Sequence, residues 1–177
     1  MTDAEDIDLQ LAAARVAARS QIRDIRLLSI EAAVHSAPDP SRGLTYDLEF
    51  EPAVDADPEN TSAFVVRIAC RLNINNLADA DDIATTSDEV ADEPVATAEF
   101  EYAALFDYHV REGEDAPAEE ELAAYATTTG RFALYPYIRE YIYDLTGRLA
   151  LPPLTIEVLS RPLPGPPERH HKSRKTS

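Results

Sequence analysis

The chain has 177 residues, enough for one domain with a buried core. Its 33 acidic side chains against 16 basic ones give a formal charge of −17, which repels a phosphate backbone and argues against nucleic acid as a direct ligand. A single cysteine excludes an intramolecular disulfide and suits a reducing compartment. The N-terminus is acidic and no apolar run is long enough to span a membrane, so a cytoplasmic protein without membrane contact is predicted.

The N-terminal third predicts one helix and one irregular strand. Residues 7–20 have apolar side chains at helical spacing, preceded by acids and followed by arginines, the order that a helix dipole favours. Between residues 21 and 34 the spacing changes to alternation, but Ile25 and Leu27 occupy odd positions and Ile30 and Val34 even ones. This change of phase predicts a β-bulge or a bend, and the proline-rich stretch that follows, 37–43, predicts a loop.

Three further strands are predicted by alternation, over about residues 44–51, 62–74 and 95–110. The segment 79–93, with seven acids and no base, is expected to be a mobile loop. Short connections and one-sided alternation favour an antiparallel sheet with one covered apolar face and one solvated face. The solvated face is expected to carry Asp47, Glu49, Glu51, Glu99 and Glu101.

The C-terminal half predicts helices and a tail. Helical spacing indicates a short helix over about 118–127 and a long one beginning near Leu134 or Tyr135, since Pro136 is tolerated only in a first turn. Pro152 and Pro153 end that helix, and residues 162–177 are expected to be a disordered, proline-rich basic tail. The expected fold is α+β: a four-stranded antiparallel sheet with helices packed on one face plus an N-terminal helix, in a single domain over residues 1–161.

The residue types of catalysis and metal binding do not converge. His35 and His109 are isolated, the other two histidines lie in the predicted tail, and Cys70 falls on an apolar strand face, where it packs as a small hydrophobe. The five glycines form no phosphate-binding loop. A protein that is not an enzyme, with no metal or cofactor, is therefore predicted. A small-ligand-binding or catalytic α+β domain stays open as the alternative, and an acidic nucleic-acid mimic is disfavoured because the acids lack regular spacing.

Four tyrosines crowd more than one side of the predicted long helix: Tyr135, Tyr137, Tyr141 and Tyr143. A helix that is apolar all round must be buried on all sides, so we expect it to pack both on its own sheet and on another copy of the chain. The alternative is that these tyrosines rim a monomeric core.

One stretch of this region resembles the SecB export-chaperone family. The run Leu134-Tyr135-Pro136-Tyr137-Ile138-Arg139-Glu140 is similar to the SecB pattern Leu-Phe-Pro-Tyr-x-Arg-Glu, and the family's apolar helix, arginine and Pro-x-Leu follow as Ile142, Leu145, Arg148, Pro152 and Leu154. The resemblance covers about residues 21–158. Leu149 stands where the family has glycine, and the basic end and extra N-terminal helix resemble the actinobacterial SecB-like chaperones associated with a stress-responsive toxin-antitoxin system.

The resemblance implies an ATP-independent holdase for protein folding and protein transport. It implies a homotetramer, a dimer of dimers, that binds unfolded proteins and preproteins, binds an antitoxin so as to control its toxin, and receives the SecA export motor on its acidic sheet face. The residues expected to line the client groove are Ile22, Asp24, Ile25, Leu27, Tyr46, Leu151, Leu154, Ile156 and Val158. Core packing is the alternative for each apolar one, and for Asp24 the alternative is a solvated or arginine-paired carboxylate.

Overall fold

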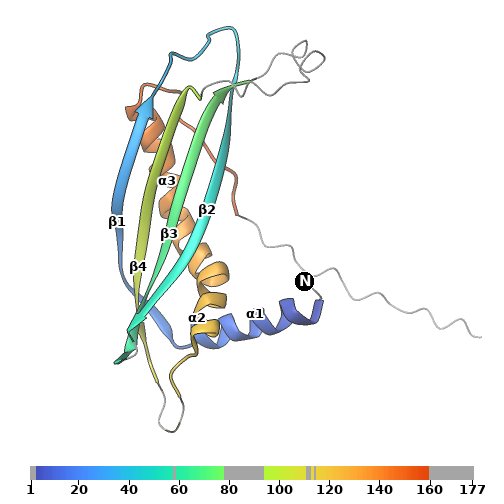
Figure 1. The fold of residues 1–177 in the computed structure, drawn as a ribbon, viewed down its shortest axis with the longest axis vertical. Coiled ribbons are helices and arrows are strands. Elements are labelled where there is room, and N and C mark those ends of the chain that lie inside the picture. The colour runs from blue at the N-terminus through green and yellow to red at the C-terminus, as the bar shows by residue number, and fades with distance from the viewer. Residues whose placement is uncertain (1–2, 58, 78–93, 111–112, 114, 160–177) are drawn as a thin grey trace, which may run out of the picture.

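The structure is a computed structural model and describes residues 3–57, 59–77, 94–110, 113 and 115–159. Its elements in chain order are α1 (Asp3–Ala17), β1 (Ser20–Val34), β2 (Leu44–Asp57), β3 (Asn60–Asn76), β4 (Ala96–Tyr108), α2 (Glu119–Tyr125), the π-helical turn η2 (Ala126–Gly130) and α3 (Arg131–Arg148). The strands form a four-stranded antiparallel sheet in the order β1-β4-β3-β2, and α3 runs across one face of it (Figure 1). The predicted α+β fold is confirmed. The expected loop 79–93 and tail 162–177 lie outside the described residues.

The core lies between α3 and the two central strands. Leu134, Ile138 and Ile142 recur every four residues along α3 and are 0% exposed, because this row of the helix faces the sheet. On the sheet, alternate residues of β3 from Phe64 to Ile74 are buried under the helix, as the alternation predicts. Cys70 belongs to this row, and burial raises the pKa of its thiol to about 12, so it packs as a neutral apolar group.

β1 departs from regular pairing at two places. The register against β4 shifts between Ile22 and Asp24 and again between Leu27 and Ser29. The second shift is the predicted bulge, and the first was not predicted. Each shift moves the helix-facing side chains of β1 from even-numbered to odd-numbered residues or back. Even-numbered residues face the helix up to Ile22, odd-numbered ones at Ile25 and Leu27, and even-numbered ones again from Ile30.

The helical region differs from the prediction. The expectation that the long helix begins near Leu134 is wrong, because α2, η2 and α3 follow one another without a break and α3 begins at Arg131. Pro136 therefore lies inside α3. Pro136 and Phe132, whose carbonyl it cannot bond, are both exposed, so water can satisfy that carbonyl. Gly130 in η2 is buried against β3, where an added Cβ would lie 3.1 Å from Val66 Cγ1.

Boundaries elsewhere moved for local reasons. α1 ends at Ala17, three residues before the predicted end, because β1 already begins at Ser20. β2 continues past Pro52 to Asp57, which is possible because β2 is an edge strand and one side of its backbone needs no ladder hydrogen bonds.

Two arginines of β3 bridge three strands on the open face of the sheet. Arg71 contacts Glu99 of β4 (Nε to Oε1, 2.9 Å) and Glu49 of β2 (Nη1 to Oε2, 3.4 Å). Arg67 contacts Glu101 of β4 (Nη1 to Oε1, 3.1 Å) and Asp55 of β2 (Nε to Oδ2, 2.6 Å). These pairs raise the pKa of both guanidinium groups, with the hydrogen-bonded carboxylate as the largest cause in each case. The predicted acidic face is thus real and partly neutralised.

Candidate functional site

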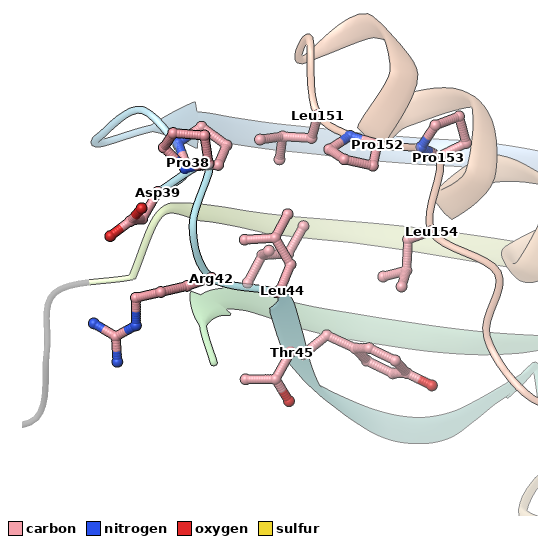
Figure 2. A pocket seen from close by; sticks show the side chains of 13 residues that line it. Pro38, Asp39, Arg42, Leu44, Thr45, Leu151, Pro152, Pro153 and Leu154 are labelled. Atoms are coloured by element: carbon pink, nitrogen blue, oxygen red, sulfur yellow. The ribbon is translucent and has the colours of Figure 1, made fainter. Parts of the chain in front are cut away.

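A cavity of about 470 Å³ opens between the loop that joins β1 to β2 and the segment that follows α3 (Figure 2). We call it the two-loop cleft. It is lined by Pro38, Asp39, Pro40, Arg42, Gly43, Leu44, Thr45, Tyr46, Ile74, Leu151, Pro152, Pro153 and Leu154. Leu44, Leu151 and Leu154 face the space between the two loops, whereas the charged end of Arg42 points away from it (Figure 2). The interior of the cleft is therefore apolar and its charges lie at the rim.

Asp39 keeps the first wall in shape. Its carboxylate accepts hydrogen bonds from the hydroxyl and the backbone N–H of Ser41 (2.6 and 2.8 Å), and its own N–H donates to Asn76 Oδ1 (3.0 Å). The bonds from Ser41 hold the pKa of the Asp39 carboxyl below its ordinary value, so it is ionised at neutral pH. Arg42 donates from its backbone N–H to the Asp39 carbonyl (3.1 Å) and from Nε to the Leu77 carbonyl (2.8 Å). The loop is tied both to itself and to the end of β3.

The second wall is held by the C-terminal turn of α3. Ala150 has a φ of 58°, and its N–H bonds to the carbonyl three residues earlier (3.2 Å) while the Leu151 N–H bonds to the Thr146 carbonyl (3.0 Å). This pair of bonds is a Schellman motif, which reverses the chain at a helix end. The fully buried Thr146 hydroxyl donates to the Ile142 carbonyl (2.9 Å) and accepts the backbone N–H of Leu154 (2.9 Å). One side chain therefore fixes Leu154 against the end of the helix.

The two walls leave a ligand few main-chain donors. Four lining residues are prolines, which have no N–H. The N–H groups of Asp39, Arg42, Leu151 and Leu154 are all bonded within the protein. The two loops therefore offer an extended ligand few main-chain donors, and the cleft suits large apolar side chains that enter it as anchors.

The structure brings together three of the nine residues expected to bind client: Tyr46, Leu151 and Leu154 line the cleft. Val158 lies further along the same segment and is 68% exposed. Ile156 is buried in the core, and its carbonyl accepts a hydrogen bond from Arg139 Nε (3.1 Å). The prediction missed Leu44, Ile74 and the four prolines. Two proline-bearing turns were visible in the sequence, but their meeting in space depends on the strand order.

The remaining four expected residues lie on β1, at the opposite edge of the sheet. Ile22, Ile25 and Leu27 pair with helix-facing residues of β4 and so lie on the side of the sheet that α3 covers. The helix does not reach them fully, since Ile22 and Leu27 keep 42% and 37% of their surface exposed. Asp24 lies on the other face, where its carboxylate accepts a hydrogen bond from Arg26. The arginine-paired alternative for Asp24 is therefore the observed one.

The four tyrosines predicted for an oligomer interface divide between two sides of α3. Tyr135 and Tyr141 pack on their own sheet, with ring centroids 5.9 Å and 5.1 Å from phenylalanine rings of β2 and β4, and burial raises the pKa of both hydroxyls. Tyr137 and Tyr143 are 44% and 52% exposed. The first pair serves the protomer, and the second pair is available to a partner.

The described residues do not favour a metal site or a membrane-spanning helix. They contain no group of three or more His, Cys, Asp or Glu side chains placed to hold a metal ion. None of the described helices combines the length and apolar character needed to cross a bilayer. Among the described residues, the cleft is therefore taken as the candidate site.

Two curated relatives from Mycobacterium tuberculosis, the SecB-like chaperone Rv1957 of strain ATCC 25618 / H37Rv and the SecB-like chaperone MT2006 of strain CDC 1551 / Oshkosh, are each 71% identical over 168 residues, 94% of this chain and 92% of the relative. A solved structure of the M. tuberculosis Rv1957 SecB-like chaperone in complex with a ChAD peptide from the Rv1956 HigA1 antitoxin matches with 68% identity and a TM-score of 0.73, covering 86% of this chain and 99% of that one. No family model matches the chain. At this identity and coverage, the chain belongs to the family of SecB-like chaperones.

Proposed function

We propose that this protein is a holdase that binds an apolar segment of an antitoxin in the two-loop cleft, keeps the antitoxin soluble and so controls its toxin. The observation that carries the proposal is the cleft itself, whose walls offer apolar side chains while most of their main-chain donors are absent or already bonded. The relative solved with an antitoxin peptide, 68% identical to this chain, supports the same class of ligand.

The mechanism needs no energy source. Each large apolar side chain that leaves water for the cleft stabilises the complex by roughly 1.5–3 kcal/mol, so two anchors contribute about 3–6 kcal/mol before the cost of ordering the client. Micromolar binding needs about 8 kcal/mol, so contacts beyond the cleft are required. A long client that also reaches other apolar surface would supply them through avidity. We extend the proposal to unfolded proteins and preproteins held in the same way in the cytoplasm.

We also propose that copies assemble through β1 and the exposed side of α3, as a tetramer made of two dimers. β1 is an edge strand, and in one protomer Ile22 and Leu27 on this strand and Tyr137 and Tyr143 on α3 leave large apolar side chains uncovered. Four chains of 19.5 kDa predict a mass of 4 × 19.5 = 78 kDa. Light scattering after size separation tests the assembly, and a mass of one protomer contradicts it.

The test of client binding compares cleft and control variants. Leu44→Ser with Leu154→Ser removes one apolar side chain from each side of the cleft, whereas Val110→Ser changes an apolar residue that is 40% exposed and lies outside it. We expect the wild type and the control to suppress aggregation of the antitoxin equally, and the double variant to bind a labelled antitoxin segment at least roughly tenfold more weakly. Equal binding by all three proteins would refute a role for the cleft.

Two further measurements separate this function from its alternative. Co-expression with the antitoxin should lengthen the antitoxin's half-life and lower toxin activity, and the double variant should do neither. A small-ligand-binding domain predicts the opposite pattern, in which small apolar compounds raise the thermal stability of the protein but the protein does not suppress aggregation. Engagement of SecA by the acidic face stays a prediction from the family.

A further inference from the structure

Arg131, the first residue of α3, carries a partly buried positive charge that no acid of the described structure neutralises. Its Cζ atom lies 4.8 Å from the centroid of the Phe50 ring of β2, a cation–π contact, and its Nε atom is buried without a hydrogen-bond partner. Six other described arginines each contact a carboxylate, whereas Arg131 takes part in none of the ion pairs found in the described ranges. In a chain with 33 acids and 16 bases, an arginine without an acid is unexpected. A partly desolvated donor without a partner costs free energy that an anionic ligand would recover.

The surroundings of Arg131 are largely apolar and partly open. Arg131 and Phe50 each keep some exposed surface, as does Tyr135, whose ring centroid lies 5.9 Å from that of Phe50. Burial raises the pKa of the Tyr135 hydroxyl, Tyr46 adds to the rise, and two arginines of α3, Arg131 among them, oppose it. Tyr135 is therefore within electrostatic reach of both Arg131 and the cleft residue Tyr46. Between such apolar rings, the attraction of an anion to the guanidinium is screened less than in open solvent.

A row of half-buried apolar side chains on β2 connects the two-loop cleft with Arg131. Leu44 and Tyr46 line the cleft, and Leu48 and Phe50 follow at alternate positions on the helix-facing side of this edge strand. A strand rises about 3.3 Å per residue, so the distance along β2 from Tyr46 to Phe50 is about 13 Å and that from Leu44 to Phe50 about 20 Å. A client that leaves the cleft in an extended conformation along β2 passes Arg131 four to six residues after its anchor.

The segment after α3 runs back along the helix in the same direction. The Leu154 N–H bonds to Thr146 near the end of α3, and the Glu157 carbonyl accepts a hydrogen bond from Tyr135, about three helical turns earlier. Arg131 lies one turn further along α3 in this direction. The second wall of the cleft and β2 thus both lead from the cleft towards Arg131.

We propose that Arg131 is a specificity residue that binds a carboxylate side chain of the client, an Asp or a Glu, four or six residues from the apolar side chain anchored in the two-loop cleft. The inference rests on the proposed client function. Successive side chains of an extended client point to opposite sides, so only an even spacing brings the carboxylate to the guanidinium. A planar guanidinium, oriented here by the Phe50 ring, matches the geometry of a carboxylate better than an ammonium would. Clients that carry this acid bind more tightly than clients that have the anchors alone.

Substitutions in the client test this role on the full, unmodified chain. The probe is a fluorescently labelled antitoxin segment whose main anchor is the apolar side chain that weakens binding most when it is changed to serine. Each position within eight residues of this anchor carries either Glu or Gln, one position at a time, and fluorescence anisotropy gives the dissociation constants. At a spacing of four or six residues we expect the Glu form to bind roughly three- to tenfold more tightly than the Gln form. At odd spacings the two forms should agree within about twofold.

Two variants of the chaperone assign the preference to one side chain. Arg131→Gln should bind the Glu and Gln forms within about twofold of each other, whereas Arg148→Gln, which changes an exposed arginine at the other end of α3, should keep the preference. Circular dichroism checks that both variants are folded, and if Arg131→Gln is not, the comparison of spacings on the wild type decides alone.

The outcomes separate this inference from the function on which it rests. Equal binding of the Glu and Gln forms by the wild type, a preference that is the same at every spacing, or one that folded Arg131→Gln retains would each overturn the role of Arg131 while client binding stands. Binding of neither form by the wild type would overturn the proposed function, and this inference with it.

Discussion

Replacing Thr146 with valine should loosen the second wall of the two-loop cleft while hardly changing its packing. Valine keeps the shape and volume of threonine but removes the hydroxyl that accepts the Leu154 N–H at 2.9 Å. A part-buried N–H left without a partner costs roughly 1–3 kcal/mol, so we expect the free energy of unfolding to fall by about 1–2 kcal/mol. If the same free energy no longer stabilises the wall that contains Leu154, a smaller fraction of the protein has this wall in the conformation that binds. The antitoxin segment should then bind at least about fivefold more weakly.

Serine at the same position is the matched control. Thr146→Ser keeps the hydroxyl and loses only a buried methyl, so it should lower the free energy of unfolding by about 1 kcal/mol yet leave the dissociation constant within about twofold. Urea titration gives the stability of both variants, and fluorescence anisotropy of a labelled antitoxin segment gives their affinity. The reasoning is refuted if valine binds like the wild type, or if serine weakens binding as much as valine does.

Three predictions concern the scaffold. Ala150→Gly should raise the free energy of unfolding by about 1 kcal/mol in a urea titration, because glycine adopts the left-handed φ of 58° without the steric cost that alanine bears; an unchanged midpoint would contradict this. Ile138→Ala should lower it by roughly 2–5 kcal/mol, since the side chain is 0% exposed between α3 and the sheet, and a loss below 1 kcal/mol would show that the site collapses. Burial raises the pKa of Cys70 and Tyr125 to about 12 from 9.0 and 10.0, and their unfolded forms ionise first as pH rises. The contribution of these two groups to the free energy of unfolding should therefore be constant below about pH 9 and fall between pH 9 and 12. Denaturant titrations at pH 8 and 10.5 would detect the difference.

The strands were predictable because each buries one face. Alternation from Phe64 to Ile74 follows directly from burial under α3, and no competing signal interrupts it. The alternation predicts the second strand only as far as Glu51. Proline is not allowed in a central strand, and only the strand order shows that β2 is an edge strand, where Pro52 is allowed. In β1 the bulge after Leu27 leaves a visible change of phase, whereas the one after Ile22 lies too near the strand end to leave a pattern.

The helical region and the cleft were less accessible for a different reason. Pro136 predicts a helix start when it is considered alone, but Pro136 and Phe132 both lie on the exposed side of α3, where a missing helix hydrogen bond is tolerated. The cleft joins residues more than a hundred positions apart, such as Leu44 and Leu154, and nothing local to either indicates the other. The resemblance to SecB supplied Tyr46, Leu151 and Leu154, while the prolines that complete the walls were interpreted only as chain breaks.

The scarcity of free donors in the cleft also bears on how selective the protein is. A segment that is gripped only by its side chains has no fixed register, so it would slip by two residues and present its next apolar side chain without breaking any ladder of hydrogen bonds. Each slipped arrangement has a similar energy. Their number adds entropy to the bound state, and unrelated sequences would then share one binding surface as long as bulky residues recur along them.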